Sequence, residues 1–171
     1  MQPVTKKRLM IRRILWVAVL GAMVLIFGFS AQTGEKSGAL SEKIARFVLS
    51  IVRPDFASLP GDEQWRVFSA CQVLVRKTAH FMEYAFLALT LCMLLYTYSL
   101  PKRAVISWVL ATLYAITDEV HQVFVGERTG AVLDVVIDSG GALFGMLIAV
   151  VILRWRQKYK NKNKRNPEEM E

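Results

Sequence analysis

The sequence has little cysteine and lacks the short motifs of common enzymes. Its two cysteines, Cys71 and Cys92, lie far apart and show neither metal-binding nor redox spacing. There is no HExxH, no phosphate-binding glycine loop and no GxSxG sequence. These absences exclude a thiolate metal site, and any chemistry must come from another arrangement of side chains.

The sequence also lacks a polar stretch long enough for a separate globular domain. Hydrophobic residues make up 54% of its 171 residues, and the formal net charge is +8. A membrane-spanning helix needs about 20 mainly apolar residues. Four apolar stretches approach or exceed this length, at residues 14–29, 81–100, 104–125 and 131–153. The pattern predicts an all-α membrane protein with a four-transmembrane-helix bundle.

The first stretch has a second interpretation, a cleaved signal peptide, because it has a basic start and an apolar core. Only a weak cleavage site follows, at residues 28–30. We favour an uncleaved first span, which residues 9–11 lengthen and whose Arg12 and Arg13 can reach the membrane surface.

Lysine and arginine predict how the bundle is oriented. Residues 1–13 form a basic tail without acids, the 101–103 connection carries Lys102 and Arg103, and residues 154–171 form a second basic tail. Four spans place these three regions on one side, the cytoplasm. We therefore expect two cytoplasmic tails flanking a membrane domain at residues 14–153. The tails orient the protein and touch anionic lipid, so we expect no nucleic-acid partner.

Residues 33–79 are expected to form an extracytoplasmic amphipathic helical segment between the first two spans. Its apolar residues fall on one helical face, opposite polar ones. Pro54 and residues 59–62 break the segment, and a second helix is expected to start near Asp62 and enter the second span. A lid over a site and a simple tether fit this pattern equally.

Ionisable and polar residues interrupt three of the apolar stretches. They are His80 and Glu83, then Asp118, Glu119, His121 and Gln122, then Asp134 and Asp138. Charge inside a bilayer is costly and usually faces a bundle interior. With alternating spans and a rise of about 1.5 Å per residue, all three groups fall in the outer leaflet. The sequence therefore predicts one site near the outer surface.

Helical spacing assigns some of these residues to shared faces. Arg76, His80 and Glu83 are spaced i, i+4, i+7, and Asp118 and Gln122 are spaced i, i+4. A histidine beside a carboxylate can act as a general base or a metal ligand, and the alternative is a buried ion pair. Glu119 points about 100° away from Asp118, and the position of His121 stays open.

Asp134 and Asp138 form a second carboxylate pair at i, i+4. Two close carboxylates ionise together only if a cation lies between them, so a divalent cation or a shared proton fits. Arg128 is the expected countercharge, anchoring an anionic headgroup or pairing with Asp134.

Other features have structural explanations. Gly141 and Gly145 form a GxxxG motif, which predicts close helix packing. Tyr84 and the other aromatic residues near span boundaries are expected to anchor the helices in the membrane.

Five motifs in sequence order resemble the VanZ-like family. They are FSAQ (29–32), RKTAHFMEY (76–84), DEVHQVF (118–124), GERTG (126–130) and DVVIDSGGALFG (134–145). The resemblance adds Gln32 to the expected site. The family's motifs also include residues that match His80, Glu83, Tyr84, Asp118, Glu119, Gln122, Arg128 and Asp134. This chain departs at Asp138, where the family often has asparagine, and at His121, where an aromatic or apolar residue is common.

The resemblance implies a small membrane protein of the bacterial cell envelope, since the named family member is associated with low-level teicoplanin resistance. On that basis we expect a multi-pass protein of the plasma membrane. It supplies no reaction and no oligomeric state.

The sequence is compatible with four kinds of function. One is an enzyme acting on a lipid or lipid-linked wall component, with candidate catalytic residues His80, Glu83, Asp118, Asp134 and Asp138, and substrate-binding residues Gln32, Arg76, Gln122 and Arg128. A second is a non-catalytic binding or accessory protein that modulates glycopeptide access, with the charged cluster as a recognition pocket. An ion path is disfavoured because residues 87–95 and 145–153 carry no charge. Purely structural pairing is the fourth.

Overall fold

The computed structural model describes residues 6–30, 34–125 and 132–165, and nearly all of them are helical. In chain order the elements are α1 (Lys6–Ser30), α2 (Gly34–Val52), the short 3-10 helix η1 (Pro54–Ser58), α3 (Gly61–Leu94), α4 (Leu100–Val125) and α5 (Val132–Arg165). The predicted all-α fold class is confirmed.

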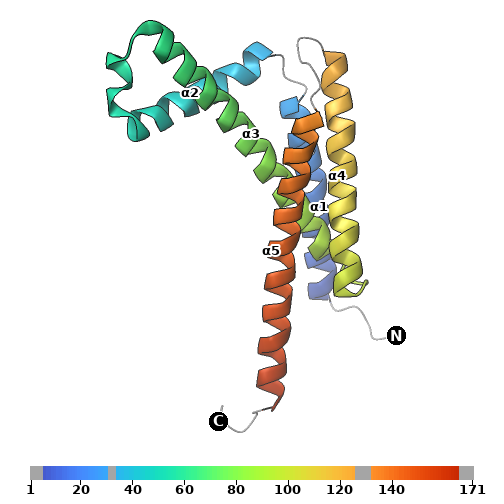
Figure 1. Ribbon diagram of the computed structural model, residues 1–171. Helices are drawn as coiled ribbons and strands as arrows, with labels where there is room; N and C mark the ends of the chain where they lie inside the picture. The colour runs from blue at the N-terminus through green and yellow to red at the C-terminus, as the bar shows by residue number, and fades with distance from the viewer. Residues whose placement is uncertain (1–5, 31–33, 126–131, 166–171) are drawn as a thin grey trace.

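Four helices form a bundle (Figure 1). α5 packs against α3 and α4, and α1 packs against α3 and α4. Only the C-terminal half of α3 belongs to the bundle, because its N-terminal half extends sideways with α2. α1 begins and α5 ends toward the same end of the bundle, and the helical hairpin leaves near the other end.

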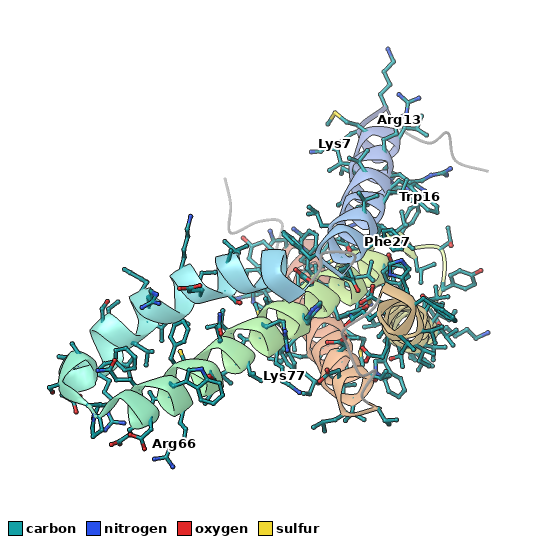
Figure 2. The ribbon with its side chains drawn as sticks, turned by 90° about the horizontal axis from the view of Figure 1, so that it is seen from above. Lys7, Arg13, Trp16, Phe27, Arg66 and Lys77 are labelled. Atoms are coloured by element: carbon teal, nitrogen blue, oxygen red, sulfur yellow. The ribbon has the colours of Figure 1, made fainter. Side chains whose placement is uncertain are left out.

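α2 and the first half of α3 form that hairpin, which Figure 2 shows projecting from the bundle. Ala45 and Leu49 of α2 are buried against α3, and the guanidinium of Arg46 lies 4.8 Å from the centre of the Phe68 ring. The expected amphipathic segment and a helix starting near Asp62 are both present, since α3 begins at Gly61 and runs unbroken into the bundle.

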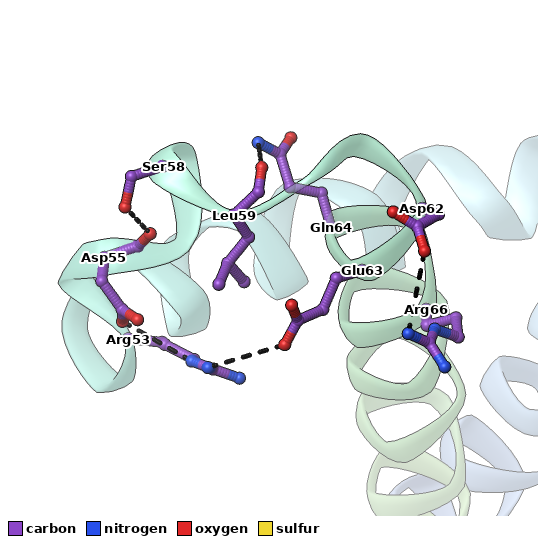
Figure 3. A network of polar contacts seen from close by, with 8 residues as sticks. All are labelled: Arg53, Asp55, Ser58, Leu59, Asp62, Glu63, Gln64 and Arg66. Carbon is purple, nitrogen blue, oxygen red and sulfur yellow. Dashed lines mark hydrogen bonds and ion pairs between the residues drawn. The ribbon is translucent and has the colours of Figure 1, made fainter.

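Polar contacts close the tip of the hairpin (Figure 3). Arg53 lies 3.5 Å from an oxygen of Asp55 and 4.0 Å from one of Glu63. The Gln64 side-chain amide donates to the carbonyl of Leu59 at 2.9 Å, and the Ser58 hydroxyl donates to the carbonyl of Asp55 at 2.7 Å. These bonds satisfy backbone groups around Pro54 and Pro60, where the helices are interrupted.

The distribution of side-chain size is that of a membrane protein. Nine of the sixteen buried hydrophobic residues among the described positions are alanine. Large apolar side chains face outward instead, for example Val24 at 70% exposure, Leu113 at 53% and Val151 at 66%. Small residues at helix interfaces and apolar outer surfaces are typical of helices in lipid.

Within the described part of the chain, two helices are long and apolar enough to cross a membrane by composition alone. They are α1, over residues 6–30, and α5, over residues 132–163. α3 and α4 carry the ionisable residues that lower their hydropathy, so the predicted count of four spans is supported here only for α1 and α5.

One predicted boundary is wrong. The second apolar stretch was expected to continue to residue 100, but α3 ends at Leu94 and α4 already begins at Leu100. The N–H of Tyr98 bonds to the carbonyl of Leu95, and the N–H of Arg103 bonds to the carbonyl of Ser99. Pro101 lacks an N–H and is suited to the first turn of a helix, which explains the early start of α4.

The GxxxG motif packs as predicted. A Cβ on Gly141 would collide with the backbone of Phe81, and one on Gly145 with the backbone of Ala85. The absence of side chains at these two positions lets the backbones of α3 and α5 approach closely. This contact fixes the register of α5 against α3, and with it the position of Asp138.

Candidate functional site

The predicted site residues that the structure describes lie on α3, α4 and α5. His80 and Glu83 come from α3, Asp118 and Gln122 from α4, and Asp138 from α5. These five residues are called the polar cluster below. Gln32 and Arg128 lie outside the described residues.

His80 and Glu83 are neighbours on one face of α3. Nδ1 of His80 lies 3.4 Å from Oε2 of Glu83, and the side chains are 18% and 24% exposed. Both atoms are buried, and neither makes a hydrogen bond within the described part of the chain. The pair is therefore an electrostatic contact with unused hydrogen-bonding capacity.

Two carboxylates from the other helices face this histidine. Asp118 is 3% exposed and Asp138 is 5% exposed, and both interact electrostatically with His80. His80 is thus the positively chargeable group among three carboxylates contributed by three helices. Such a histidine can hold a proton between acidic groups and transfer it.

Asp118 and Gln122 share an interior face, as their spacing predicts. Nε2 of Gln122 donates a hydrogen bond to Oδ2 of Asp118 at 3.1 Å. The other oxygen, Oδ1, is buried without a hydrogen-bond partner among the described residues. Buried carboxylate oxygens are costly to leave unpaired, which makes this position a candidate for binding a ligand group.

Glu119 and His121 lie at the edges of the polar cluster. Glu119 is only half-buried, although its carboxylate still interacts electrostatically with Asp138. The His121 ring packs on Phe27 of α1, with ring centroids 4.5 Å apart. His121 therefore lies between α4 and α1 and interacts with Asp118 from that side.

Asp134 has a partner that the sequence analysis did not identify. Lys77 Nζ forms an ion pair and hydrogen bond with Oδ1 of Asp134, and the two side chains are 31% and 38% exposed. Figure 2 shows Lys77 on the part of α3 beside α5. Among the described residues the countercharge of Asp134 is Lys77, while the expected pairing with Arg128 lies outside them. Asp134 is more exposed than Asp138 but still interacts with it electrostatically.

A signal for Lys77 was present in the sequence. Lys77, Phe81 and Ala85 are spaced i, i+4, i+8 on α3. Since Gly141 and Gly145 pack on Phe81 and Ala85, the same face carries Lys77 toward the start of α5.

Tyr84 and Ser30 also belong near the polar cluster. Tyr84 is completely buried, so its predicted role as a membrane anchor is wrong. Its ring centroid lies 6.3 Å from that of Tyr114, and its hydroxyl has no hydrogen-bond partner among the described residues. Ser30, the last residue of α1, is buried beside Asp118. The Tyr84 hydroxyl and the Ser30 hydroxyl add two neutral donors to the charged groups.

A cavity of about 210 Å³ gives access to one side of the polar cluster. His80 and Glu83 line it together with Arg76, whose side chain is exposed. The remaining walls are mainly apolar, from α1, α2 and α3: Phe29, Leu40, Ile44, Val75 and Ala79. The cavity, called the α2–α3 groove below, combines a guanidinium, an imidazole and a carboxylate with an apolar surface.

The described residues do not assemble a ready metal site. Among them, no three His, Cys, Asp or Glu side chains are grouped so that they could hold a metal ion. Asp134 is engaged by Lys77, and Asp118 by Gln122.

These features define an all-helical membrane protein with a polar cluster, two of whose residues, His80 and Glu83, line an apolar groove. The chain belongs to the VanZ/LLP1 family, whose match covers residues 15–154. Comparisons with curated proteins and with solved structures gave no match.

Proposed function

We propose that this protein is a four-span membrane protein of the bacterial cell envelope that binds or acts on a lipid or lipid-linked envelope component. Its polar cluster faces the outer leaflet, and both termini are cytoplasmic. In keeping with the family resemblance, its cellular role is in the response to glycopeptides such as teicoplanin.

The surface of the bundle supports four spans. α4 presents large apolar side chains along its length, including Val105, Leu113 and Val120, each more than half exposed. α3 does the same with Met82 and Phe86 in the bundle region. Exposed apolar surface of this extent is costly in water and favourable in lipid.

Charge supports the orientation. The end of the bundle where α1 begins, α4 begins and α5 ends carries basic residues and no acid within residues 6–30, 95–117 and 139–165. By the positive-inside rule that end is cytoplasmic, so the polar cluster and the hairpin lie toward the outside.

The observation that carries the functional proposal is the position of His80 and Glu83. They line the apolar α2–α3 groove and also adjoin the buried carboxylates of Asp118 and Asp138. A lipid headgroup entering between α2 and α3 meets Arg76 first, since a guanidinium binds phosphate or carboxylate in a bidentate manner. Its acyl part rests on Phe29, Leu40 and Ile44.

At the bottom of the groove, His80 acts as the proton-exchanging group. Its imidazole lies beside the Glu83 carboxylate and interacts electrostatically with Asp118 and Asp138, and in its protonated form it donates a hydrogen bond to an anionic ligand group. In an enzyme the same proton would be passed to a leaving oxygen, and His80 would regain a proton from the attacking water through a neighbouring carboxylate.

A non-catalytic accessory protein that limits glycopeptide access is the second candidate. It is favoured by the contacts that already engage two of the carboxylates, Gln122 with Asp118 and Lys77 with Asp134. In that case the polar cluster recognises a ligand without changing it.

The test is lipid and wall-precursor profiling, with teicoplanin sensitivity measured in parallel. Cells that carry His80→Asn are expected to show the lipid and precursor profile and the teicoplanin sensitivity of cells without the protein. The variant is expected to accumulate to the same level as the unaltered protein. Thr117→Ala is the matched control, because Thr117 is exposed on α4 and its hydroxyl bonds to the carbonyl of Tyr114, three residues back on the same helix.

The two measurements together distinguish the enzyme from the accessory protein. A changed sensitivity with an unchanged lipid and precursor profile favours the accessory protein over the enzyme. If His80→Asn protein accumulates normally and behaves as the unaltered protein in both measurements, the proposed site is wrong.

A further inference from the structure

A second and larger cavity lies at the end of the bundle opposite the hairpin. Its volume is about 480 Å³, and residues of α1, α3, α4 and α5 line it. Because all four bundle helices contribute, it is formed by the tertiary fold rather than by one helix surface. It contains none of the residues of the polar cluster.

Four arginines surround this cavity: Arg8 and Arg12 from α1, Arg103 from α4 and Arg156 from α5. None of them forms an ion pair within the described part of the chain. Nε of Arg103 is buried and has no hydrogen-bond partner among the described residues. A buried guanidinium nitrogen in this state calls for an acceptor.

The described helix ends around this cavity carry no acid to neutralise these arginines. Residues 6–30, 84–117 and 139–165, which form the described part of this end of the bundle, contain no Asp or Glu, and Glu168, Glu169 and Glu171 lie outside the described residues. Four like charges around one cavity repel each other unless an anion joins them. No described residue supplies the missing charge, so an anion that joins the arginines would stabilise this end of the bundle.

The cavity walls between the arginines are apolar. Leu15, Met93 and Leu153 line it from three helices, and Tyr96 lies at the α3 end. An inorganic anion would use only the guanidinium groups. A molecule with an anionic group and a hydrocarbon chain would use both surfaces.

We propose that this cavity binds an anionic membrane phospholipid. Its phosphodiester accepts hydrogen bonds from Arg103 and the surrounding arginines, and its acyl chain lies against Leu15, Met93 and Leu153. Guanidinium groups bind phosphate in a bidentate manner, and basic pockets between membrane helices are suited to lipid headgroups. The bound lipid holds together the ends of helices whose charges otherwise repel. This site is independent of the function proposed above.

The experiment uses the full-length protein in a zwitterionic detergent. Dihexanoyl-phosphatidylglycerol, dihexanoyl-phosphatidylcholine and inorganic phosphate are titrated separately, and binding is followed by calorimetry and native mass spectrometry. The anionic lipid is expected to bind, and the other two to bind much more weakly. Each of Arg12→Gln and Arg103→Gln is expected to weaken binding of the anionic lipid roughly fivefold.

Arg13→Gln is the matched control, since Arg13 is exposed at the same end of α1 and does not line the cavity. It is expected to bind the anionic lipid as the unaltered protein does, and so is His80→Asn. Circular dichroism checks that each variant is folded, and Arg156→Gln replaces Arg103→Gln if that variant does not fold.

Three results would each overturn the proposal. The first is equal affinity for the anionic and the zwitterionic lipid. The second is an equal loss of binding in Arg13→Gln and Arg12→Gln. The third is inorganic phosphate binding as tightly as the anionic lipid, which would make this an anion site without lipid.

Discussion

Asp118 and Lys77 show how differently two charged residues in one helical bundle can be used. Asp118 is almost fully buried and is held by Gln122 on its own helix, whereas Lys77 is partly exposed and joins α3 to α5 through Asp134. A partly exposed ion pair contributes about 0–1 kcal/mol to stability. A buried carboxylate with an unpaired oxygen lowers stability and is retained for another reason.

Replacing Asp118 with asparagine tests this difference. The new side chain keeps the shape of the old one, and its amide oxygen can still accept the hydrogen bond from Gln122, but a buried charge is removed. We expect Asp118→Asn to unfold at the same or a higher temperature, with a gain of up to about 2 kcal/mol. We expect the lipid profile and teicoplanin sensitivity to become those of cells without the protein.

Thermal unfolding in detergent measures the first expectation, and the cellular assays measure the second. An Asp118→Asn protein that is less stable yet fully functional would mean that Asp118 has a structural role only.

Sequence patterns identified the members of the polar cluster better than their partners. Asp118 and Gln122 were paired by i, i+4 spacing, which depends only on local helix geometry. Lys77 was missed, and Tyr84, which the family motif includes, was expected at a span boundary rather than buried, because the surroundings of both depend on which face of α3 meets α5 and α1. The rotation of α3 about its own axis is set by tertiary packing. Tyr84 has the sequence position of a membrane anchor although its side chain is completely buried.

The contact between α3 and α5 is the element-level feature on which the polar cluster depends. Gly141 and Gly145 bring the α5 backbone against Phe81 and Ala85, and Asp138 lies one turn before Gly141. A wider separation of the two helices would move Asp138 away from His80. Close packing and site geometry therefore have a common cause.

Gly145→Ala is expected to destabilise the protein by about 1–3 kcal/mol, because its methyl group meets the backbone of Ala85, which cannot rotate away. Gly140→Ala is the matched control. Its methyl group would lie 3.8 Å from the ring of Phe81, an ordinary contact, and alanine is the better helix former by about 1 kcal/mol. Unfolding in detergent compares them, and equal stabilities would contradict the packing described for Gly145.

The helices themselves were largely predictable, because long apolar runs and basic ends are properties of the sequence alone. The end of α3 was not, since residues 95–100 carry no charge and still include Leu95, Tyr96, Tyr98 and Leu100. The chain turns there because the N–H of Tyr98 bonds back to Leu95 and Pro101 starts a new helix. Apolar composition predicts burial in lipid but does not say where a helix stops.

The two ends of the molecule differ in their charged residues. Toward one end the hairpin, the α2–α3 groove and the polar cluster lie together, with acidic and basic residues mixed. The other end has four arginines around a cavity and no acidic residue within residues 6–30, 84–117 and 139–165, which form its described part. This asymmetry of charge fits a protein that crosses the membrane in one fixed orientation.

Cysteine labelling in intact cells tests that orientation. Cys71→Ser removes the half-buried native thiol, while Cys92 is fully buried and needs no change. In this background, cysteine at the exposed position Asp62 is expected to react with a membrane-impermeant maleimide in intact cells. Cysteine at the exposed position Lys158 is expected to react only after the cells are opened, because the basic end of α5 is retained in the cytoplasm.

The opposite labelling pattern would reverse the orientation and place the polar cluster on the cytoplasmic side. Labelling of both positions in intact cells would contradict an odd number of spans between them, and with it the crossing of the membrane by all of α3, α4 and α5.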